Sequence, residues 1–329
     1  MKIKIRSIEK YLPKKRISSV ELDKICNGRE GRIEKNTGVK FRHHVDATET
    51  VAEMGSLALK KALISAKLEP KDLDLLIFSG AAYEYPVPHT AVVIKSKITN
   101  DSVNFNCIDV DSTCLSFLSA MEIAHMYIEL KKHHRIAIVC SEISSCALTP
   151  TEEKEFGLFG DASVAMIIEG TNHGGYTPIY TDFKNFPSGA LYANVPIGGC
   201  SNRGKLNDST DKGYNFKMDG KNLIRLTQKH INQFTDQMEN SIGYKVRDFD
   251  YFVTHQTSRW GNEFFIRNFH VDQNKTIETL ADYGNCISAS IPLGIEKLFN
   301  SNQNLNQKKV MLLGTGAGLT LGTMALEFD

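Results

Sequence analysis

The chain has 329 residues, of which 41% are hydrophobic and 23% charged, a balance typical of a soluble globular protein. Intrinsic disorder, collagen and a coiled coil are thereby excluded, and the length predicts two domains or one large fold made of two halves. The 39 basic and 38 acidic side chains nearly cancel, so the global charge does not indicate binding to nucleic acid or to a membrane.

Seven cysteines are spread along the chain without a C-x-x-C pair. This pattern argues against a secreted disulfide framework and against a zinc site. The first fifteen residues carry charges at every second or third position, unlike a signal peptide. The longest uncharged stretch, 310–326, is interrupted by four glycines and is too short to span a membrane. We therefore expect a cytoplasmic protein without a metal or a membrane segment.

Short apolar runs alternate with helical patterns through the first half of the chain. A helical segment is expected from about Pro88, and a long helix is expected after Cys114, where apolar residues recur at helical spacing. Strands are expected over 73–80, 103–110, 135–142 and 160–168. Such alternation predicts an α/β fold with largely parallel strands.

The segment 170–216 is polar and rich in glycine, which predicts loops and extended hairpins. We place a boundary near its start, with one domain over 1–170 and the other over 171–329. The second half then repeats the order of elements, which suggests an internal duplication. Its expected elements are a helix over 218–240, a strand over 250–255, helices near 258–268 and after Ile291, and two short strands around the last glycine-rich turn.

Cys114 is the first candidate for chemistry. It lies between the predicted strand 103–110 and the long helix, so its sulfur is expected near the first-turn amides of that helix. A helix N-terminus stabilises negative charge and lowers the pKa of a thiol, which favours a nucleophile. Taken alone, however, a cysteine is more often a core residue.

His255 and Asn285 are two further candidates. His255 follows the strand 250–255, at the kind of sheet edge where α/β proteins carry sites, and Asn285 lies in a turn of small residues before the last helix. Taken singly, His255 is more often a packing residue and Asn285 more often part of a simple turn. Together they can donate hydrogen bonds to a carbonyl oxygen that becomes negative.

The closing segment from Gly314 to Gly322 could be mistaken for a dinucleotide-binding motif. Too few residues follow it for the helix and strand that such a motif needs. A glycine-rich turn that brings a backbone N–H close to a ligand fits better.

Several segments together resemble the β-ketoacyl-acyl-carrier-protein synthase III family of the thiolase superfamily, in the right order along the chain. The matching segments are Thr37 to His43, the nucleophile segment around Cys114, Phe159-Gly160-Asp161, His255-Gln256, Gly284 to Pro292 and Gly316 to Gly322. The resemblance implies a five-layered αβαβα thiolase-like fold of two duplicated halves, the first with the nucleophilic cysteine and the second with the histidine and asparagine. It also implies a homodimer without metal or redox cofactor that uses coenzyme A or phosphopantetheine thioesters as substrates.

The reaction implied by this resemblance has two steps. Cys114 takes an acyl group from acyl-coenzyme A or an acyl-carrier protein, while the backbone amides of Cys114 and Ala317 hold the oxyanion. His255 and Asn285 then hydrogen-bond to the carbonyl of a malonyl thioester, carbon dioxide leaves, and the enolate attacks the acyl group in a decarboxylative Claisen condensation. Because decarboxylation needs no strong base, His255 is expected to act as a neutral donor.

Some positions depart from the family pattern around the thioester. Arg32 and Glu153 stand where housekeeping members carry a Trp and an Arg around the adenine of coenzyme A, which favours a carrier-protein donor. Arg225 matches a basic position used for the carrier protein, although a solvated helix face explains it equally well. Trp260 is a further candidate contact with coenzyme A or the carrier protein.

Other departures concern the acyl pocket. Ser112 and Thr113 replace a pair of alanines of the housekeeping enzymes, and Tyr83, Tyr85 and Val87 are expected to line the acyl pocket. These differences suggest a member specialised for a fatty-acid or polyketide-type pathway. The identity and length of the acyl group stay open.

Three rival interpretations also stay open. A non-decarboxylative condensing enzyme or an acyltransferase of the same fold would share the acyl-Cys114 intermediate, and the condensing version needs a carboxylate base, for which Glu84 is the only nearby candidate. A papain-like hydrolase has Cys, His and Asn at similar spacing, but its local signature is absent. A non-catalytic partner subunit is disfavoured because all three candidate residues are present.

Overall fold

The structure is a computed structural model and describes residues 2–200, 212–301 and 303–329. Its helices are α1 (Ser19–Ile25), α2 (Arg32–Thr37), α3 (Val51–Ala66), α4 (Thr90–Ile98), α5 (Ser116–Glu129), α6 (Glu153–Leu158), α7 (Gly220–Ile242), α8 (Arg259–Phe269), α9 (Leu280–Tyr283) and α10 (Ser290–Asn300). Its strands are β1 (Lys2–Tyr11), β2 (Lys15–Ser18), β3 (Phe41–His44), β4 (Leu75–Ser79), β5 (Asn106–Val110), β6 (Arg135–Glu142), β7 (Ala162–Thr171), β8 (Tyr176–Asn185), β9 (Ala193–Asn194), β10 (Lys217–Met218), β11 (Tyr251–Thr254), β12 (Lys309–Gly316) and β13 (Thr320–Phe328). Over the described ranges, none of the helices combines the length and the apolar character needed to cross a membrane.

Nine of the described strands form one sheet in the order β11-β12-β13-β8-β1-β7-β6-β4-β5. The sheet is nearly divided at its centre, because β1 and β8 are paired only through Ile3 and Tyr176. The junction separates a first half-sheet (β1, β7, β6, β4, β5) from a second half-sheet (β8, β13, β12, β11). The strands of the two half-sheets follow the same pattern of directions. In the first, β4 is parallel to β6 and the pairs β6-β7 and β7-β1 are antiparallel. In the second, β11-β12 is parallel and β12-β13 and β13-β8 are antiparallel.

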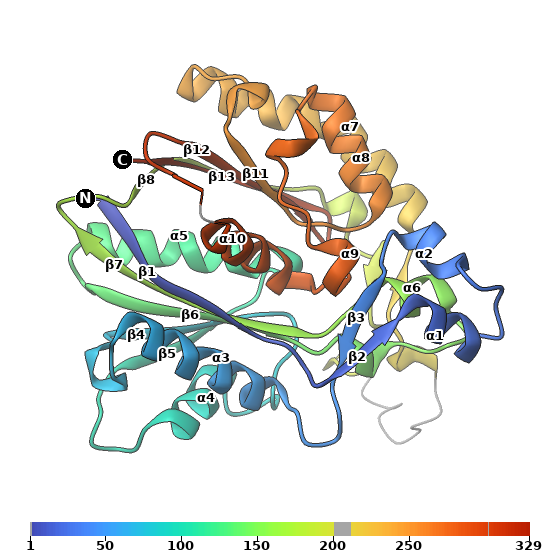
Figure 1. Ribbon diagram of the computed structural model, residues 1–329, viewed down its shortest axis with the longest axis horizontal. Helices are drawn as coiled ribbons and strands as arrows, with labels where there is room; N and C mark the ends of the chain where they lie inside the picture. Colours follow the sequence, from blue (N-terminus) through green and yellow to red (C-terminus); the bar gives the residue numbers. More distant parts are fainter. Residues whose placement is uncertain (1, 201–211, 302) are drawn as a thin grey trace.

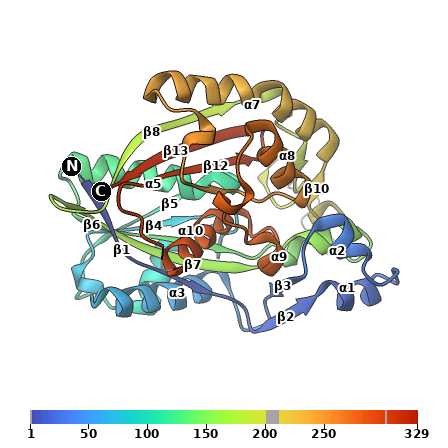
Figure 2. The same ribbon diagram turned by 45° about the horizontal axis from the view of Figure 1, so that its top comes forward.

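The helices and half-sheets are stacked in five layers (Figure 1). Helices α3 and α4 cover the outer face of the first half-sheet, α5 and α10 lie between the half-sheets, and α7 and α8 cover the outer face of the second (Figures 1 and 2). Separate clusters of buried apolar side chains fill the central layer and the two outer layers. The predicted αβαβα architecture is confirmed.

The position of each helix follows from its apolar residues. Central α5 is buried along most of its length, including Phe117, Leu118 and Met121, because a half-sheet covers it on either side. Outer α7 instead has one buried stripe, with Ile231, Phe234 and Met238 at helical spacing and polar side chains facing solvent. A helix that packs between two sheets must therefore be apolar on both faces, and an outer one only on one.

Every element predicted between residue 73 and the end of the chain has a counterpart in the structure, apart from the segment 170–216. There the ten-residue strand β8 replaces part of the expected loops, and residues 201–211 lie outside the described part. The prediction of largely parallel strands is wrong, because four of the pairings in the large sheet are antiparallel over long registers. Helical crossovers make parallel pairs, but β12 and β13 follow each other through a tight turn and so run antiparallel. The division into 1–170 and 171–329 stays a prediction.

Candidate active site

Cys114 lies in the short 3-10 helix Thr113–Leu115, directly between β5 and α5. Burial raises the pKa of its thiol to about 12, and the nearby Glu142 carboxylate acts in the same direction. The backbone N–H groups of Ala317 and of Cys114 itself, with the Thr113 hydroxyl, oppose this because each would favour a negative sulfur. The expected lowering of the thiol pKa is therefore wrong for the resting protein, because removal from water outweighs the helix terminus.

His255 follows β11, and its backbone N–H donates to the Leu313 carbonyl on β12 over 2.8 Å. Its ring nitrogen Nδ1 lies 2.9 Å from the Thr315 carbonyl oxygen, and Nε2 lies 3.2 Å from Oδ1 of Asn285. Burial lowers the pKa of His255, although both of these contacts favour the charged ring. The resting imidazole is therefore neutral at physiological pH.

Asn285 is held by its backbone and by its side chain. Its N–H donates to the Leu158 carbonyl over 2.9 Å, and its own carbonyl accepts from Gly160 N–H over 3.1 Å. Oδ1 accepts from the Ile287 N–H over 2.9 Å as well as facing His255. The amide nitrogen Nδ2 has no hydrogen-bond partner among the described residues and so remains available to a ligand.

These contacts bear on where the protons of His255 lie. The Thr315 carbonyl and Oδ1 of Asn285 can each only accept, so a neutral ring with one proton can satisfy one of them, from Nδ1 or from Nε2. Both contacts become hydrogen bonds only when the ring holds two protons. The role of His255 as a neutral donor stays a prediction.

Glycines allow β12 to lie against the nucleophile segment. A Cβ atom on Gly314 would lie 2.7 Å from the Leu115 side chain and 2.9 Å from Cβ of His255. The strands β12 and β13 form the expected hairpin, and Ala317 lies in its turn. The glycine-rich turn therefore places Ala317 in the wall of the cavity that Cys114 lines, and its role as an oxyanion donor stays a prediction.

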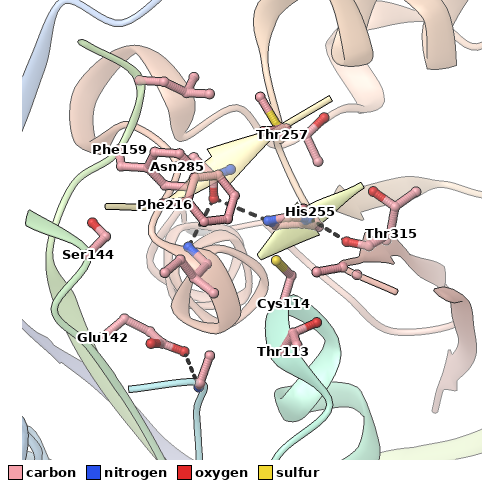
Figure 3. A pocket seen from close by; sticks show the side chains of 18 of the residues that line it. Thr113, Cys114, Glu142, Ser144, Phe159, Phe216, His255, Thr257, Asn285 and Thr315 are labelled. Atoms are coloured by element: carbon pink, nitrogen blue, oxygen red, sulfur yellow. Dashed lines mark hydrogen bonds between the residues drawn. The ribbon is translucent and has the colours of Figure 1, made fainter. Parts of the chain in front are cut away.

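Cys114, His255 and Asn285 line a single cavity of about 1190 Å³ (Figure 3). They reach it from three segments that are far apart in the sequence. Much of its wall is apolar, with contributions from Ile143, Leu148, Leu158, Phe159, Ile197, Phe216, Leu223, Ile224 and Phe264. Such a wall suits a hydrocarbon chain, with the polar groups concentrated around the sulfur.

The structure separates the expected acyl-pocket residues. Tyr83 and Tyr85 line the cavity. Val87 does not, and its side chain is 84% exposed, because the loop from Tyr85 to His89 runs along the surface. The prediction that Val87 lines the acyl pocket is therefore wrong for the single chain.

Of the residues expected to contact coenzyme A or the carrier protein, one lines the cavity and two lie outside it. Trp260 lines the cavity and stacks on Phe264 with 5.3 Å between ring centroids. Arg32 lies outside the cavity and forms an ion pair with Glu153, with 3.0 Å between Nε and Oε1. Arg225 is an exposed residue of α7 and is not part of the cavity wall.

Sequence reasoning missed Glu142, the last residue of β6. It is fully buried and lines the same cavity (Figure 3). The N–H groups of Ala81 and Ala82 donate to its two oxygens over 2.9 and 3.0 Å, and the Ser288 hydroxyl donates over 2.5 Å. Burial raises the pKa of Glu142 to about 7 against these hydrogen bonds. Glu84, which caps the first turn of α3 through the Ala52 N–H, is therefore not the only carboxylate in the cavity.

Two family models match the chain. The model of 3-oxoacyl-[acyl-carrier-protein] synthase III matches residues 108–185, and the model of the C-terminal part of the same enzymes matches residues 239–328. The first match covers Cys114 and the second covers His255 and Asn285. Within the described residues, no three His, Cys, Asp or Glu side chains are grouped so that they could hold a metal ion.

Known proteins are similar over almost the whole chain. A β-ketoacyl-[acyl-carrier-protein] synthase III of Neisseria gonorrhoeae is 28% identical over 327 residues, which cover 99% of each chain. The crystal structure of a 3-oxoacyl-[acyl-carrier-protein] synthase III of Aquifex aeolicus VF5 has a TM-score of 0.87 at 22% identity, over 99% of both chains. The priming β-ketosynthase of the R1128 polyketide pathway has a TM-score of 0.86 at 22% identity, over 99% of this chain and 96% of that one. Together with the family models, these similarities establish that the chain belongs to the β-ketoacyl-[acyl-carrier-protein] synthase III family of condensing acyltransferase-type enzymes.

Proposed function

We propose that this enzyme transfers an acyl group to Cys114 and condenses it with a malonyl thioester, with loss of carbon dioxide. The observation that carries the proposal is the meeting of Cys114, His255 and Asn285 in one largely apolar cavity. The N–H of Ala317 beside the sulfur supplies a donor for an oxyanion. Nucleophile, proton acceptor and oxyanion donors are thus available to one bound thioester.

In the first step, the proton of the Cys114 thiol passes to Nε2 of His255, and the thiolate attacks the carbonyl carbon of the acyl thioester. The backbone N–H groups of Cys114 and Ala317 hold the oxygen while it is negative. The carbon–sulfur bond of the donor then breaks, and its thiolate leaves and takes a proton from solvent. His255 keeps the proton of Cys114, which both of its acceptors, Thr315 and Asn285, stabilise.

In the second step, the bond to the carboxylate of the malonyl thioester breaks and its electrons form an enolate. Nδ2 of Asn285 and the protonated Nε2 of His255 donate to the enolate oxygen. The enolate carbon attacks the acyl carbon, the bond to Cys114 breaks, and the Cys114 thiolate regains its proton from His255. The products are carbon dioxide and a β-ketoacyl thioester.

The acyl donor is proposed to be carried by an acyl-carrier protein, within a fatty-acid or polyketide-type pathway. Arg32 and Glu153 neutralise each other across the place where the family resemblance puts the adenine of coenzyme A. An ion pair there leaves neither side chain free to hold the base and the nearby phosphate. Exposed Arg225 on α7 supplies a positive charge for an acidic carrier surface. The homodimer stays a prediction.

The intact mass of the protein after incubation with a panel of acyl-coenzyme A and acyl-carrier-protein thioesters tests the proposal. One acyl group should add to the wild type and none to Cys114→Ala. Malonyl thioester should then remove the added mass and form a β-ketoacyl product. Uptake of an acyl group by Cys114→Ala would refute the assigned nucleophile.

Two further variants separate the steps. Asn285→Ala should still be acylated but release carbon dioxide slowly, because Asn285 donates to the malonyl thioester, whereas in acylation it only supports the protonated His255 beside Thr315. His255→Ala should be slow in both steps, because it loses the proton acceptor. If acylation occurs and malonyl thioester changes nothing, the enzyme is an acyltransferase or a non-decarboxylative condensing enzyme. Absence of acylation would favour a non-catalytic partner subunit.

A further inference from the structure

Thr113, the residue before Cys114, has an unusual backbone conformation. Its φ is 54°, in the left-handed region that branched side chains rarely adopt. The conformation is held on both sides, since its N–H donates to Asp111 over 2.7 Å and its carbonyl accepts from the Ser116 hydroxyl over 2.7 Å. A glycine or an alanine would be less strained at this position. The strain suggests that the threonine side chain itself is needed there.

The Thr113 hydroxyl is also unsatisfied. Its oxygen is buried and has no hydrogen-bond partner among the described residues. An unpaired buried hydroxyl costs stability, and a catalytic role is one of the explanations for such a group in a native protein. The position therefore combines a strained backbone with an unpaired buried hydroxyl.

The reactive group next to this hydroxyl is the sulfur of Cys114. On one side it lies against Gly316, where a Cβ atom would be only 2.9 Å from the Thr113 oxygen. The residue lines the cavity next to Cys114, and a hydrogen bond from this hydroxyl favours the charged form of the sulfur. A neutral thiol is a weak acceptor, whereas a thiolate is a strong one. The missing partner is therefore created when Cys114 loses its proton.

We propose that Thr113 is an additional catalytic residue, whose hydroxyl donates a hydrogen bond to the sulfur of Cys114 whenever that sulfur is negative. The inference rests on the proposed acyl transfer to Cys114. In that reaction the sulfur is negative twice, as the nucleophile after its proton has passed to His255 and as the leaving group when the enolate attacks. Thr113 keeps its own proton throughout, so no atom is gained or lost. A donor fixed before the charge appears requires no rearrangement during the reaction.

The test uses a reagent that does not depend on the acyl-transfer function. Iodoacetamide reacts with the thiolate, and peptide mass analysis follows the alkylation of Cys114 separately from the other cysteines. Thr113→Val keeps the branched shape and removes the hydroxyl, and should slow alkylation of Cys114 about tenfold at fixed pH and displace its pH profile to higher pH. Thr113→Ser keeps the hydroxyl and should react at close to the wild-type rate. Thr113→Ala should resemble Thr113→Val and covers the case that valine does not fold.

Thermal unfolding provides the structural readout. Thr113→Val removes an unpaired buried hydroxyl, so its Tm should equal or exceed that of the wild type although its Cys114 is less reactive. Equal alkylation rates for the wild type, Thr113→Val and Thr113→Ser would overturn the inference, whether or not the protein accepts acyl groups. A tenfold loss in Thr113→Val and Thr113→Ala but not in Thr113→Ser would support the inference. This holds even if no thioester acylates the wild type, because that result would refute only the proposed function.

Discussion

Among the described residues, no cation balances the carboxylic acid of Glu142. It is fully buried, and its partners are the N–H groups of Ala81 and Ala82 and the hydroxyl of Ser288. The titratable groups influenced by its charge are the thiols of Cys114, Cys140 and Cys286. Because burial raises the pKa of Glu142 to about 7, its charge near the reactive sulfur changes within the physiological range.

The pKa of Glu142 has a consequence for stability. The folded protein binds this proton more tightly than the unfolded chain, so the contribution to stability is fully present below about pH 4.5 and is lost as the pH rises through about 7. A shift of this size corresponds to about 3 kcal/mol. The variant Glu142→Gln cannot ionise, so the wild type should lose stability relative to it between pH 5 and pH 8. Urea unfolding of both proteins at several pH values measures this difference, and parallel curves would contradict it.

The sequence indicated Cys114, His255 and Asn285 because each lies where a strand or turn meets a helix and within a family motif. The structure brings all three into one cavity. The sequence could not indicate Glu142, because this residue ends an apolar strand and has no motif around it. It also could not indicate the strain at Thr113, since a φ angle is set by the contacts of a turn and not by residue type alone.

At the scale of elements, the turn that carries Asn285 depends on the segment before β7. Backbone hydrogen bonds join Leu158 and Gly160 to Asn285 in both directions. The next residue, Asp161, accepts from the N–H groups of Val45 and Ser144 and so fixes the same segment to the ends of β3 and β6. The catalytic amide is thus positioned by a chain of backbone contacts that begins in the other half of the protein.

Among these backbone contacts, the packing is tightest at Gly160. A Cβ atom there would lie 2.2 Å from the carbonyl oxygen of Tyr283, which is backbone and cannot move without moving the Asn285 turn. Gly160→Ala should therefore reduce carbon dioxide release about 100-fold, as expected for a displacement of about 1 Å, and reduce acylation much less. Gly28→Ala is a suitable control, because its nearest neighbour would be 3.5 Å away. Equal losses in both half-reactions would show that the substitution acts by general destabilisation.

The elements themselves could be predicted unevenly. Long helices and buried strands after residue 73 were recognised because their apolar residues repeat at a clear period. The central strand β1 was not, because charged side chains lie between its apolar positions Ile3 and Ile8 and resemble a solvated segment. Strand β8 is only half-buried along most of its length, so its sequence resembles loops. Pairing with distant strands decides such segments, and that information is not local.

At the scale of the whole molecule, the two halves share one interior. The central cluster contains residues of α5 from the first half and of α10 from the second. Lys10 on β1 binds both carboxylate oxygens of nearly buried Glu296 on α10 over 2.7 Å. The active site itself combines Cys114 from the first half with His255 from the second. Because the two halves share this interior, we expect them to unfold as one unit.

The single tryptophan, Trp260, makes this testable, because it lies on α8 and so reports on the second half of the protein. Phe78 is buried in the opposite outer layer, so Phe78→Ala should cost about 3–5 kcal/mol there. If the halves unfold together, the variant lowers the guanidinium midpoint of Trp260 fluorescence and of far-UV circular dichroism by the same amount. Ile64→Ala, on the exposed face of α3, should leave both midpoints unchanged. A fluorescence midpoint that stays in place while the circular dichroism shifts would instead mean that the second half-sheet and its helices are stable without the first.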